Sequence, residues 1–233
     1  MENMNSQVLE RELPFAGDEK PGEVSQQDGM ARSGLYRVCK RAFDIVCSAL
    51  ALIIASPLLL ITAVCIKLES KGPALFCQER VGKDKKIFRI YKFRSMCVDA
   101  PKLHEKLKEQ AGDTSGSFKP KDDPRITKVG KVIRKLSIDE LPQLFNILKG
   151  DMSIVGPRPL PTYEAKDLPS DYDDRFRVLP GLTCTWQISG RSEISFEQRM
   201  EMDVAYVKER SLIKDFALIL KTVPAVLTGR GAY

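Results

Sequence analysis

One stretch of the chain constrains its fold more than any other, because residues 45–66 contain no charged side chain. A helix that spans a bilayer needs about 20 consecutive apolar residues, so this run is long enough to enter a membrane and is long for a buried soluble helix. Ser56 and Pro57 interrupt the run near its middle. A proline inside a helix removes a backbone hydrogen bond and kinks or breaks the helix. We therefore expect a membrane-embedded segment with a break at Ser56-Pro57.

Basic residues flank both ends of this run, with Arg37, Lys40 and Arg41 before it and Lys67 and Lys71 after it. Such residues favour the cytoplasmic side of a membrane. Two arrangements fit the pattern. One is a spanning helix with a proline kink. The other is a re-entrant hairpin that enters and leaves the same leaflet, and the basic residues at both ends favour it.

Charge is distributed unevenly along the chain. Residues 1–33 have a net charge of −4 and the whole chain +6, so the remaining residues carry +10. The first segment is polar, lacks apolar periodicity and does not begin like a signal peptide, so we expect a disordered acidic tail. The basic remainder indicates an anionic partner: a phospholipid surface, nucleotide phosphates or nucleic acid. The expected organisation is this tail, a re-entrant membrane hairpin over residues 34–72, and a cytoplasmic or interfacial domain over residues 73–233.

The cysteine and histidine content argues against several kinds of site. The chain has six cysteines, none in a C-x-x-C pair, and two of them lie inside the uncharged run. This usage fits a reducing compartment and neither a zinc site nor a disulfide framework. His104 is the only histidine, and its charged neighbours indicate a solvated helix position. A histidine-ligated metal and a Ser-His-Asp triad are therefore not expected.

The fold is expected to be α+β and mainly helical, with one small β-hairpin. Residues 74–78 and 86–91 have the composition of two short strands joined by a turn. Apolar residues at helical spacing predict amphipathic helices, some with the basic faces of interfacial helices. A polar loop is expected over residues 112–120. The expected helices cover residues 101–111, 126–136, 196–210 and 212–227, and a further helix ends at Lys149-Gly150.

Two adjacent carboxylates, Asp139 and Glu140, stand where a helix is expected to begin, close to Pro142. Two interpretations remain open. In the first, Ser137 and Glu140 form a capping box and Asp139 complements the helix dipole. In the second, the helix N-terminus, a good position for phosphate, carries an aspartate nucleophile beside a metal-binding glutamate.

Cationic side chains from several parts of the chain suit phosphate binding, although they also fit a solvated or lipid-headgroup face. Lys92 and Arg94 follow the second strand, Arg134 lies just upstream of the acids, and Arg158 stands between two prolines in a stiff loop. Arginine binds phosphate in a bidentate manner. The only tryptophan, Trp186, fits stacking on a base, a membrane-interface position or a core position equally well.

Several motifs, in this order, resemble the bacterial sugar transferase family, the monotopic polyprenyl-phosphate phosphoglycosyl transferases. The resemblance runs from about Tyr36 to the C-terminus and leaves only the tail uncovered. The motifs are Lys40-Arg41-Ala42-Phe43-Asp44, Ser56-Pro57 in the uncharged run, Tyr91-Lys92-Phe93-Arg94-Ser95-Met96, Asp123-Pro124-Arg125-Ile126-Thr127, Ser137-Ile138-Asp139-Glu140-Leu141-Pro142-Gln143, Gly150-Asp151-Met152-Ser153, Gly156-Pro157-Arg158-Pro159 and Trp186-Gln187-Ile188-Ser189-Gly190-Arg191.

The resemblance implies an enzyme that transfers a sugar phosphate from a UDP-sugar to undecaprenyl phosphate and releases UMP. It implies a catalytic domain on the cytoplasmic face of the bacterial inner membrane, and the first step of an exopolysaccharide, capsule, O-antigen or glycoprotein glycan. Asp139 matches the nucleophile that forms a covalent phosphosugar adduct. Glu140 matches its partner associated with Mg²⁺, so both acids are expected at the metal. Ser56-Pro57 matches the helix break of the family.

Substrate or phosphate contacts are expected from Lys92, Arg94, Arg134, Arg158, Gln187 and Arg191. Downstream glycosyltransferases are possible partners, and nucleic acid is not an expected one. The chain departs from the family habit at Cys184-Thr185, where Gly-Leu is expected before Trp186, and this puts the sugar preference in doubt. A second hypothesis from another class is a non-catalytic, membrane-anchored basic adaptor, which would be indifferent to substitution of Asp139 and Glu140.

Overall fold

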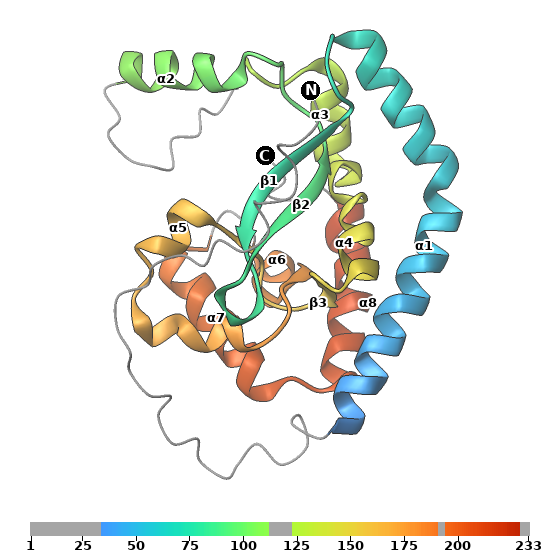
Figure 1. Ribbon diagram of the computed structural model, residues 1–233, viewed down its shortest axis with the longest axis vertical. Coiled ribbons are helices and arrows are strands. Elements are labelled where there is room, and N and C mark those ends of the chain that lie inside the picture. Colours follow the sequence, from blue (N-terminus) through green and yellow to red (C-terminus); the bar gives the residue numbers. More distant parts are fainter. Residues whose placement is uncertain (1–33, 112–122, 191–193, 229–233) are drawn as a thin grey trace, which may run out of the picture.

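The computed structural model describes residues 34–111, 123–190 and 194–228. The predicted acidic tail and the predicted loop over residues 112–120 lie outside this part of the chain. The described residues form a mainly helical fold with two small sheets (Figure 1). This confirms the predicted α+β, mainly helical fold class at that level.

The uncharged run lies within one continuous helix, α1 (Gly34–Glu69), which contains Pro57. Within the described part of the chain it is the helix that is long and apolar enough to cross a membrane, judged by length and composition. The Oγ of Ser56 donates a hydrogen bond of 2.8 Å to the carbonyl of Ile53. Figure 1 shows that α1 bends near its middle without reversing direction. The predicted break at Ser56-Pro57 is therefore wrong for the backbone, because α1 continues through Pro57 as one helix.

The first turns of α1 are fastened to α8 (Leu212–Thr228). The Nζ of Lys40 lies 2.7 Å from Oδ2 of Asp215, and the hydroxyl of Tyr36 donates to the same oxygen at 3.2 Å. Tyr36 and Asp215 are both buried. Because these bonds are shielded from water, they hold the start of α1 against the body of the protein.

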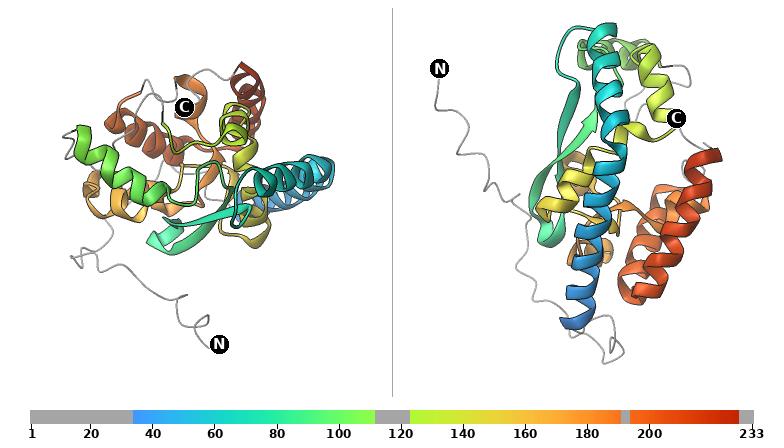
Figure 2. Two further views of the ribbon diagram at one scale, coloured as in Figure 1. Left: turned by 90° about the horizontal axis from the view of Figure 1, so that it is seen from above. Right: turned by 90° about the vertical axis from the view of Figure 1, so that its right-hand side faces the viewer.

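The last turn of α1 is fastened to the same body at its other end. The carboxylate of Glu69 accepts hydrogen bonds of 2.7 and 3.1 Å from the amides of Lys128 and Val129. These amides begin α3 (Lys128–Lys135). Between the two ends one face of the helix is exposed, since Ile53 and Ile54 are 70% and 79% exposed. Figure 2 shows α1 running along one side of the body over its full height.

The predicted hairpin is confirmed as β1 (Leu75–Val81) and β2 (Ile87–Phe93), which pair antiparallel. The short helix η1 (Lys83–Lys85) forms the turn between them. A third strand that was not predicted, β4 (Leu160–Pro161), pairs with the end of β1. The third strand brings the segment after Arg158 against the hairpin that carries Lys92.

The predicted helices after the hairpin are present as α2 (Ala100–Ala111) and α3. Thr127 caps α3 by accepting a hydrogen bond from the amide of Gly130. After α3 the short helix η2 (Ile138–Glu140) leads to α4 (Gln143–Lys149). α4 ends at Gly150, whose φ of 95° is left-handed and suits glycine, so the predicted Lys149-Gly150 stop is confirmed.

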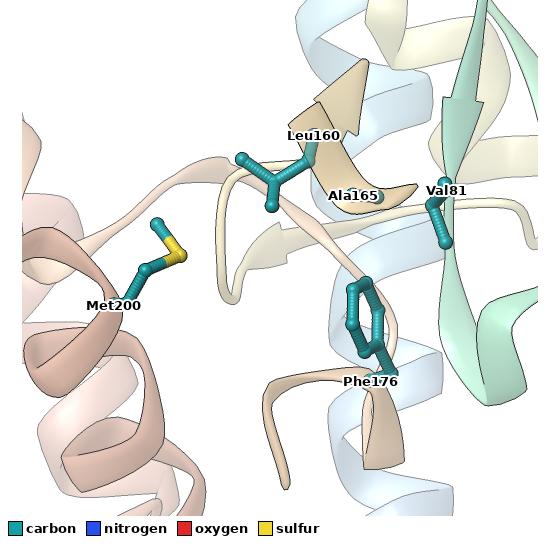
Figure 3. Packing of buried hydrophobic residues seen from close by; sticks show 5 residues of the cluster. All are labelled: Val81, Leu160, Ala165, Phe176 and Met200. Carbon is teal, nitrogen blue, oxygen red and sulfur yellow. The ribbon is translucent and has the colours of Figure 1, made fainter. Parts of the chain in front are cut away.

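The C-terminal part of the fold surrounds a two-stranded parallel sheet of β3 (Ser153–Val155) and β5 (Gly181–Thr183). Helices α7 (Phe196–Glu209) and α8 confirm the two helices predicted there. Figure 3 shows a cluster of buried side chains from five elements, which joins this part to the hairpin. The cluster consists of Val81, Leu160, Ala165, Phe176 and Met200. The remaining elements are α5 (Thr162–Lys166), η3 (Ser170–Arg177) and α6 (Thr185–Ser189).

The loop that follows β3 passes unusually close to β5, and glycine at Gly156 and Gly181 makes this possible. A β-carbon on Gly181 would collide with the backbone of Gly156, and one on Gly156 would collide with the carbonyl of Leu179. We expect Gly181→Ala to lower the free energy of unfolding by about 1–3 kcal/mol, because the two backbones must separate. Chemical unfolding in detergent measures this. Gly34→Ala is the control, since a β-carbon there has no described neighbour within 4 Å; equal effects of the two variants would contradict the prediction.

Candidate functional site

Glu140 is the centre of a cluster of charges drawn from three separate parts of the chain. Its Oε1 accepts hydrogen bonds from Nζ of Lys92 at 2.7 Å and from Nη2 of Arg158 at 2.6 Å. Lys92 is on β2, Glu140 is on η2, and Arg158 is in the loop between β3 and β4. The structure therefore brings together three of the residues predicted from the sequence. Both cations lie on the same carboxylate oxygen.

The charges of this cluster set the protonation of its members. Burial alone would raise the pKa of Glu140, but the charges and hydrogen bonds of Arg158 and Lys92 outweigh it and hold this pKa well below its usual range. Glu140 in turn raises the pKa of Arg158, and burial lowers the pKa of Lys92. Glu140 is therefore ionised and fixed in place at neutral pH.

Asp139 has a different environment from its neighbour. It makes no hydrogen bond or ion pair with the described residues. Burial, and then the negative charge of Glu140, raise the pKa of Asp139 to about 6, although Lys92, Arg134 and Arg158 act in the opposite direction. Arg134, the predicted basic residue upstream of the acids, therefore acts on Asp139 through its positive charge. Asp139 is thus a carboxylate without a fixed counterion in a strongly cationic neighbourhood.

The local backbone rules out the capping box. Ser137 has a left-handed φ of 55°, and its side chain makes no capping hydrogen bond. Pro142 occupies the position just before α4, and the acids lie on η2 ahead of it. The interpretation of Ser137 and Glu140 as a cap is therefore wrong, because the chain turns at Ser137 and Glu140 bonds to distant cations instead.

The loop that presents Arg158 is held by arginines that the sequence analysis did not single out. Nη2 of Arg175 donates to the carbonyl of Arg158 at 2.7 Å and to Oδ2 of Asp203 at 2.8 Å. Nη1 of Arg80 donates to the carbonyl of Pro159 at 3.1 Å. Arg175 and Asp203 are almost completely buried. Their sequence neighbourhoods are charged and suggested surface positions, so no local pattern could have revealed the pair.

The other residues predicted to contact substrate lie in different parts of the fold. The guanidinium of Arg94 donates to the carbonyls of Ser70 and Lys71, so it is engaged at the end of α1 and not with the acids. Gln187 lies on α6 beside Trp186. The ring of Trp186 has the guanidinium of Arg158 at 6.0 Å and that of Arg199 at 5.0 Å from its centroid. Arg191 lies outside the described residues.

A largely apolar groove of about 1150 Å³ is lined by residues of α1, the hairpin and α4. One wall comes from the second half of α1, including Leu59 and Ala63, and another from α4, including Pro142 and Phe145. The two charged residues in its described lining are Lys67 and Lys149, both cationic. The groove thus lies along the exposed apolar helix and reaches Pro142, two residues after Glu140.

The side chains of the site provide only some of the oxygen ligands that Mg²⁺ requires. The described residues contain no cluster of three or more His, Cys, Asp or Glu side chains that could enclose a metal ion. Mg²⁺ is commonly held by one or two carboxylates, with substrate phosphates and water completing its shell. Asp139 and the Oε2 of Glu140 provide such a pair, since the two cations lie on Oε1. The residues therefore fit a metal whose shell is completed by a phosphorylated substrate.

Comparison with known proteins gives close relatives. An undecaprenyl-phosphate galactose phosphotransferase of Salmonella typhimurium is 45% identical over 201 residues, which is 84% of this chain and 42% of that protein. An undecaprenyl-phosphate glucose phosphotransferase of Komagataeibacter xylinus is 42% identical over 205 residues, or 83% of this chain and 37% of that protein. The chain therefore spans less than half the length of these relatives. The exopolysaccharide production protein ExoY of Rhizobium meliloti is 38% identical over 234 residues, which cover 99% of this chain and all of that protein.

The family comparison covers most of the chain. Residues 35–229 match the family described as bacterial sugar transferase. This range includes α1 from its second residue, the hairpin, the two acids and the loop of Arg158, and it leaves out residues 1–33. The chain therefore belongs to the bacterial sugar transferase family.

Proposed function

We propose that this chain transfers a sugar 1-phosphate from a UDP-sugar to undecaprenyl phosphate and releases UMP. The observation that carries the proposal is the cluster of Lys92 and Arg158 on Glu140, beside an Asp139 that has no fixed counterion. The named relatives that act on undecaprenyl phosphate support the substrate class. The transfer would begin the assembly of a polysaccharide.

The proposed mechanism has two displacements at one phosphorus atom. In the first, a carboxylate oxygen of Asp139 attacks the phosphorus that bears the sugar. An O–P bond forms, the bond from that phosphorus to the bridging oxygen breaks, and UMP leaves. In the second, a phosphate oxygen of undecaprenyl phosphate attacks the same phosphorus and frees the carboxylate. Dividing one displacement into two lowers the barrier of each.

The cations of the site stabilise the charge that moves during both displacements. Arg158 and Lys92 would bind the phosphate oxygens, with Arg134 close by. Asp139 and Glu140 would hold Mg²⁺, which neutralises phosphate charge when it is bound. Because Glu140 fixes both Arg158 and Lys92 before the substrate arrives, little reorganisation is needed during the reaction.

The proposed topology is re-entrant, with the catalytic domain on the cytoplasmic face of the inner membrane. Both ends of α1 are bonded to the same body, through Asp215 at one end and Glu69 at the other. Two ends fastened to one body lie on the same side of any bilayer that the middle of the helix enters. The exposed residues around Ser56-Pro57 would form the inserted part. The apolar groove from α1 toward Asp139 would receive the isoprenoid chain of the acceptor.

The test is UMP release by the detergent-solubilised protein from a panel of UDP-sugars. We expect release with at least one donor, dependent on undecaprenyl phosphate for turnover. Removal of divalent metal with EDTA is expected to reduce the rate by about 10²-fold or more, because phosphate charge is then less well neutralised. Restoring Mg²⁺ should restore the rate.

The adaptor hypothesis predicts the opposite results. A non-catalytic adaptor would release no UMP from any donor and would bind its anionic partner in a salt-dependent manner. UMP release that persists in EDTA would remove the metal from the proposal while leaving the transfer in place.

A further inference from the structure

Arg41, in the second turn of α1, contacts the end of the helix that follows the two acids. Its Nη1 and Nη2 donate to the carbonyls of Ile147 and Leu148 at 2.6 and 2.9 Å. These carbonyls belong to the last turn of α4, where carbonyls lack the usual amide partner four residues on. The carbonyl of Ile147 also accepts a hydrogen bond of 3.1 Å from the amide of Gly150. Arg41 therefore caps α4 from outside with two parallel hydrogen bonds, and its positive charge is favourable at a helix C-terminus.

Asp44, one turn further along α1, contacts the strand that leads to Arg158. Its Oδ1 accepts a hydrogen bond of 3.0 Å from the amide of Ile154 in the middle of β3. Asp44 is only 2% exposed, so this bond is made away from water. A buried amide that loses its acceptor is costly, and the strand is held firmly for that reason.

The two contacts converge on the catalytic centre from the same helix. α4 starts three residues after Glu140, and β3 ends three residues before Arg158. Ala51 and Leu52 of α1 also pack on the core that contains Leu144, Ile147 and Met152. We propose that Arg41 and Asp44 are positioning residues, through which α1 fixes the distance between the acid pair and Arg158. The kinetic side of this inference rests on the proposed function.

A simpler account of these residues is that they supply charge at the membrane surface. Arg37 provides the comparison, because it is one turn from Arg41 on the same helix and is exposed. A surface-charge role would make Arg37 and Arg41 equivalent. The role of Asp44 as an acceptor can be separated from its charge, since Asn keeps a carbonyl oxygen for the amide of Ile154 and Ala does not.

The experiment compares Asp44→Ala with Asp44→Asn in the full chain in detergent. Both changes remove the charge, and only the first removes the acceptor. Hydrogen exchange measured by mass spectrometry should be about fivefold faster or more in a peptide over residues 153–158 of Asp44→Ala, and near the wild-type rate in Asp44→Asn. In a peptide over residues 143–152, Arg41→Gln should raise exchange and Arg37→Gln should not.

The same proteins are then assayed for UMP release. Asp44→Ala is expected to lower kcat by about tenfold or more, with the KM for the UDP-sugar within about twofold of wild type, since misplacement of catalytic groups affects the rate more than binding. Asp44→Asn should recover most of kcat. Equal exchange and equal kcat in Asp44→Ala and Asp44→Asn would overturn the inference. So would equal exchange in Arg41→Gln and Arg37→Gln. If the wild type releases no UMP from any donor, the proposed function fails, and the exchange rates alone decide whether α1 fixes these segments.

Discussion

Asp139→Asn is expected to reduce UMP release by roughly 10³-fold or more, because an amide cannot replace a carboxylate as nucleophile. The change is nearly isosteric, so the backbone of η2 and the contacts of Glu140 should persist. Glu140 keeps its two cations in this variant, which makes the loss specific to the attacking group. UMP release is measured with the preferred donor under saturating undecaprenyl phosphate.

A trapping experiment makes the same prediction sharper. Wild-type protein incubated with a UDP-sugar labelled in the sugar phosphate should retain label after denaturation, and Asp139→Asn should retain none. Asp171→Asn is the control, since Asp171 is an exposed acid on η3 and should behave like wild type. Full turnover by Asp139→Asn would remove the covalent mechanism. Label found on a different residue would assign the role of nucleophile to that residue.

Asp203→Ala is expected to lower the free energy of unfolding by about 3–5 kcal/mol, because it leaves the buried guanidinium of Arg175 without its counterion. The pair is 2.8 Å apart, with side chains that are 2% and 1% exposed. Burial raises the pKa of Asp203 to about 6 although Arg175 lowers it, so unfolding should be measured near pH 8, where the carboxylate is ionised. The same change should also reduce UMP release, since Arg175 holds the carbonyl of Arg158.

The control for this second prediction lies on the same helix. Glu209 pairs with Lys214 at 2.6 Å, but its side chain is 67% exposed. Exposed pairs contribute about 1 kcal/mol or less, so Glu209→Ala should change the unfolding free energy little. If Asp203→Ala proves no more destabilising than Glu209→Ala, the buried pair does not stabilise the loop of Arg158.

Local pattern predicted much of the secondary structure of this chain. The hairpin, α2, α3, α7, α8 and the stop at Gly150 follow from periodicity and turn residues, whose causes lie within a few positions. Ser137 shows where such rules end. Its sequence fits a capping box with Glu140, yet Glu140 bonds to Lys92 and Arg158, which lie 48 and 18 residues away in the chain. The role of the Glu140 carboxylate is therefore set by residues that are distant in the sequence.

The sequence indicated the charged residues of the candidate site, but it did not indicate the buried residues that hold them in place. The resemblance of ordered motifs indicated Asp139, Glu140, Lys92 and Arg158, because each stands in a recognisable string. Arg175 and Asp203 stand in segments whose charge suggests solvent, and only the fold shows that they are buried partners. Arg94 illustrates the converse, since a cation predicted to bind phosphate instead donates to the carbonyls of Ser70 and Lys71, just after α1.

The fastening of both ends of α1 to one body has a consequence for the kind of membrane this protein can use. A helix that crosses a bilayer must match its hydrocarbon thickness, and a mismatch costs energy for each ångström. Here the distance between the two anchors, at Asp215 and at Glu69, is fixed by the protein. In the proposed re-entrant topology, the depth that the middle of α1 reaches would then be set by the fold and not by the thickness of the bilayer. Such an anchor would sit equally well in thin and thick bilayers, and it would respond to the lateral packing of the leaflet it enters.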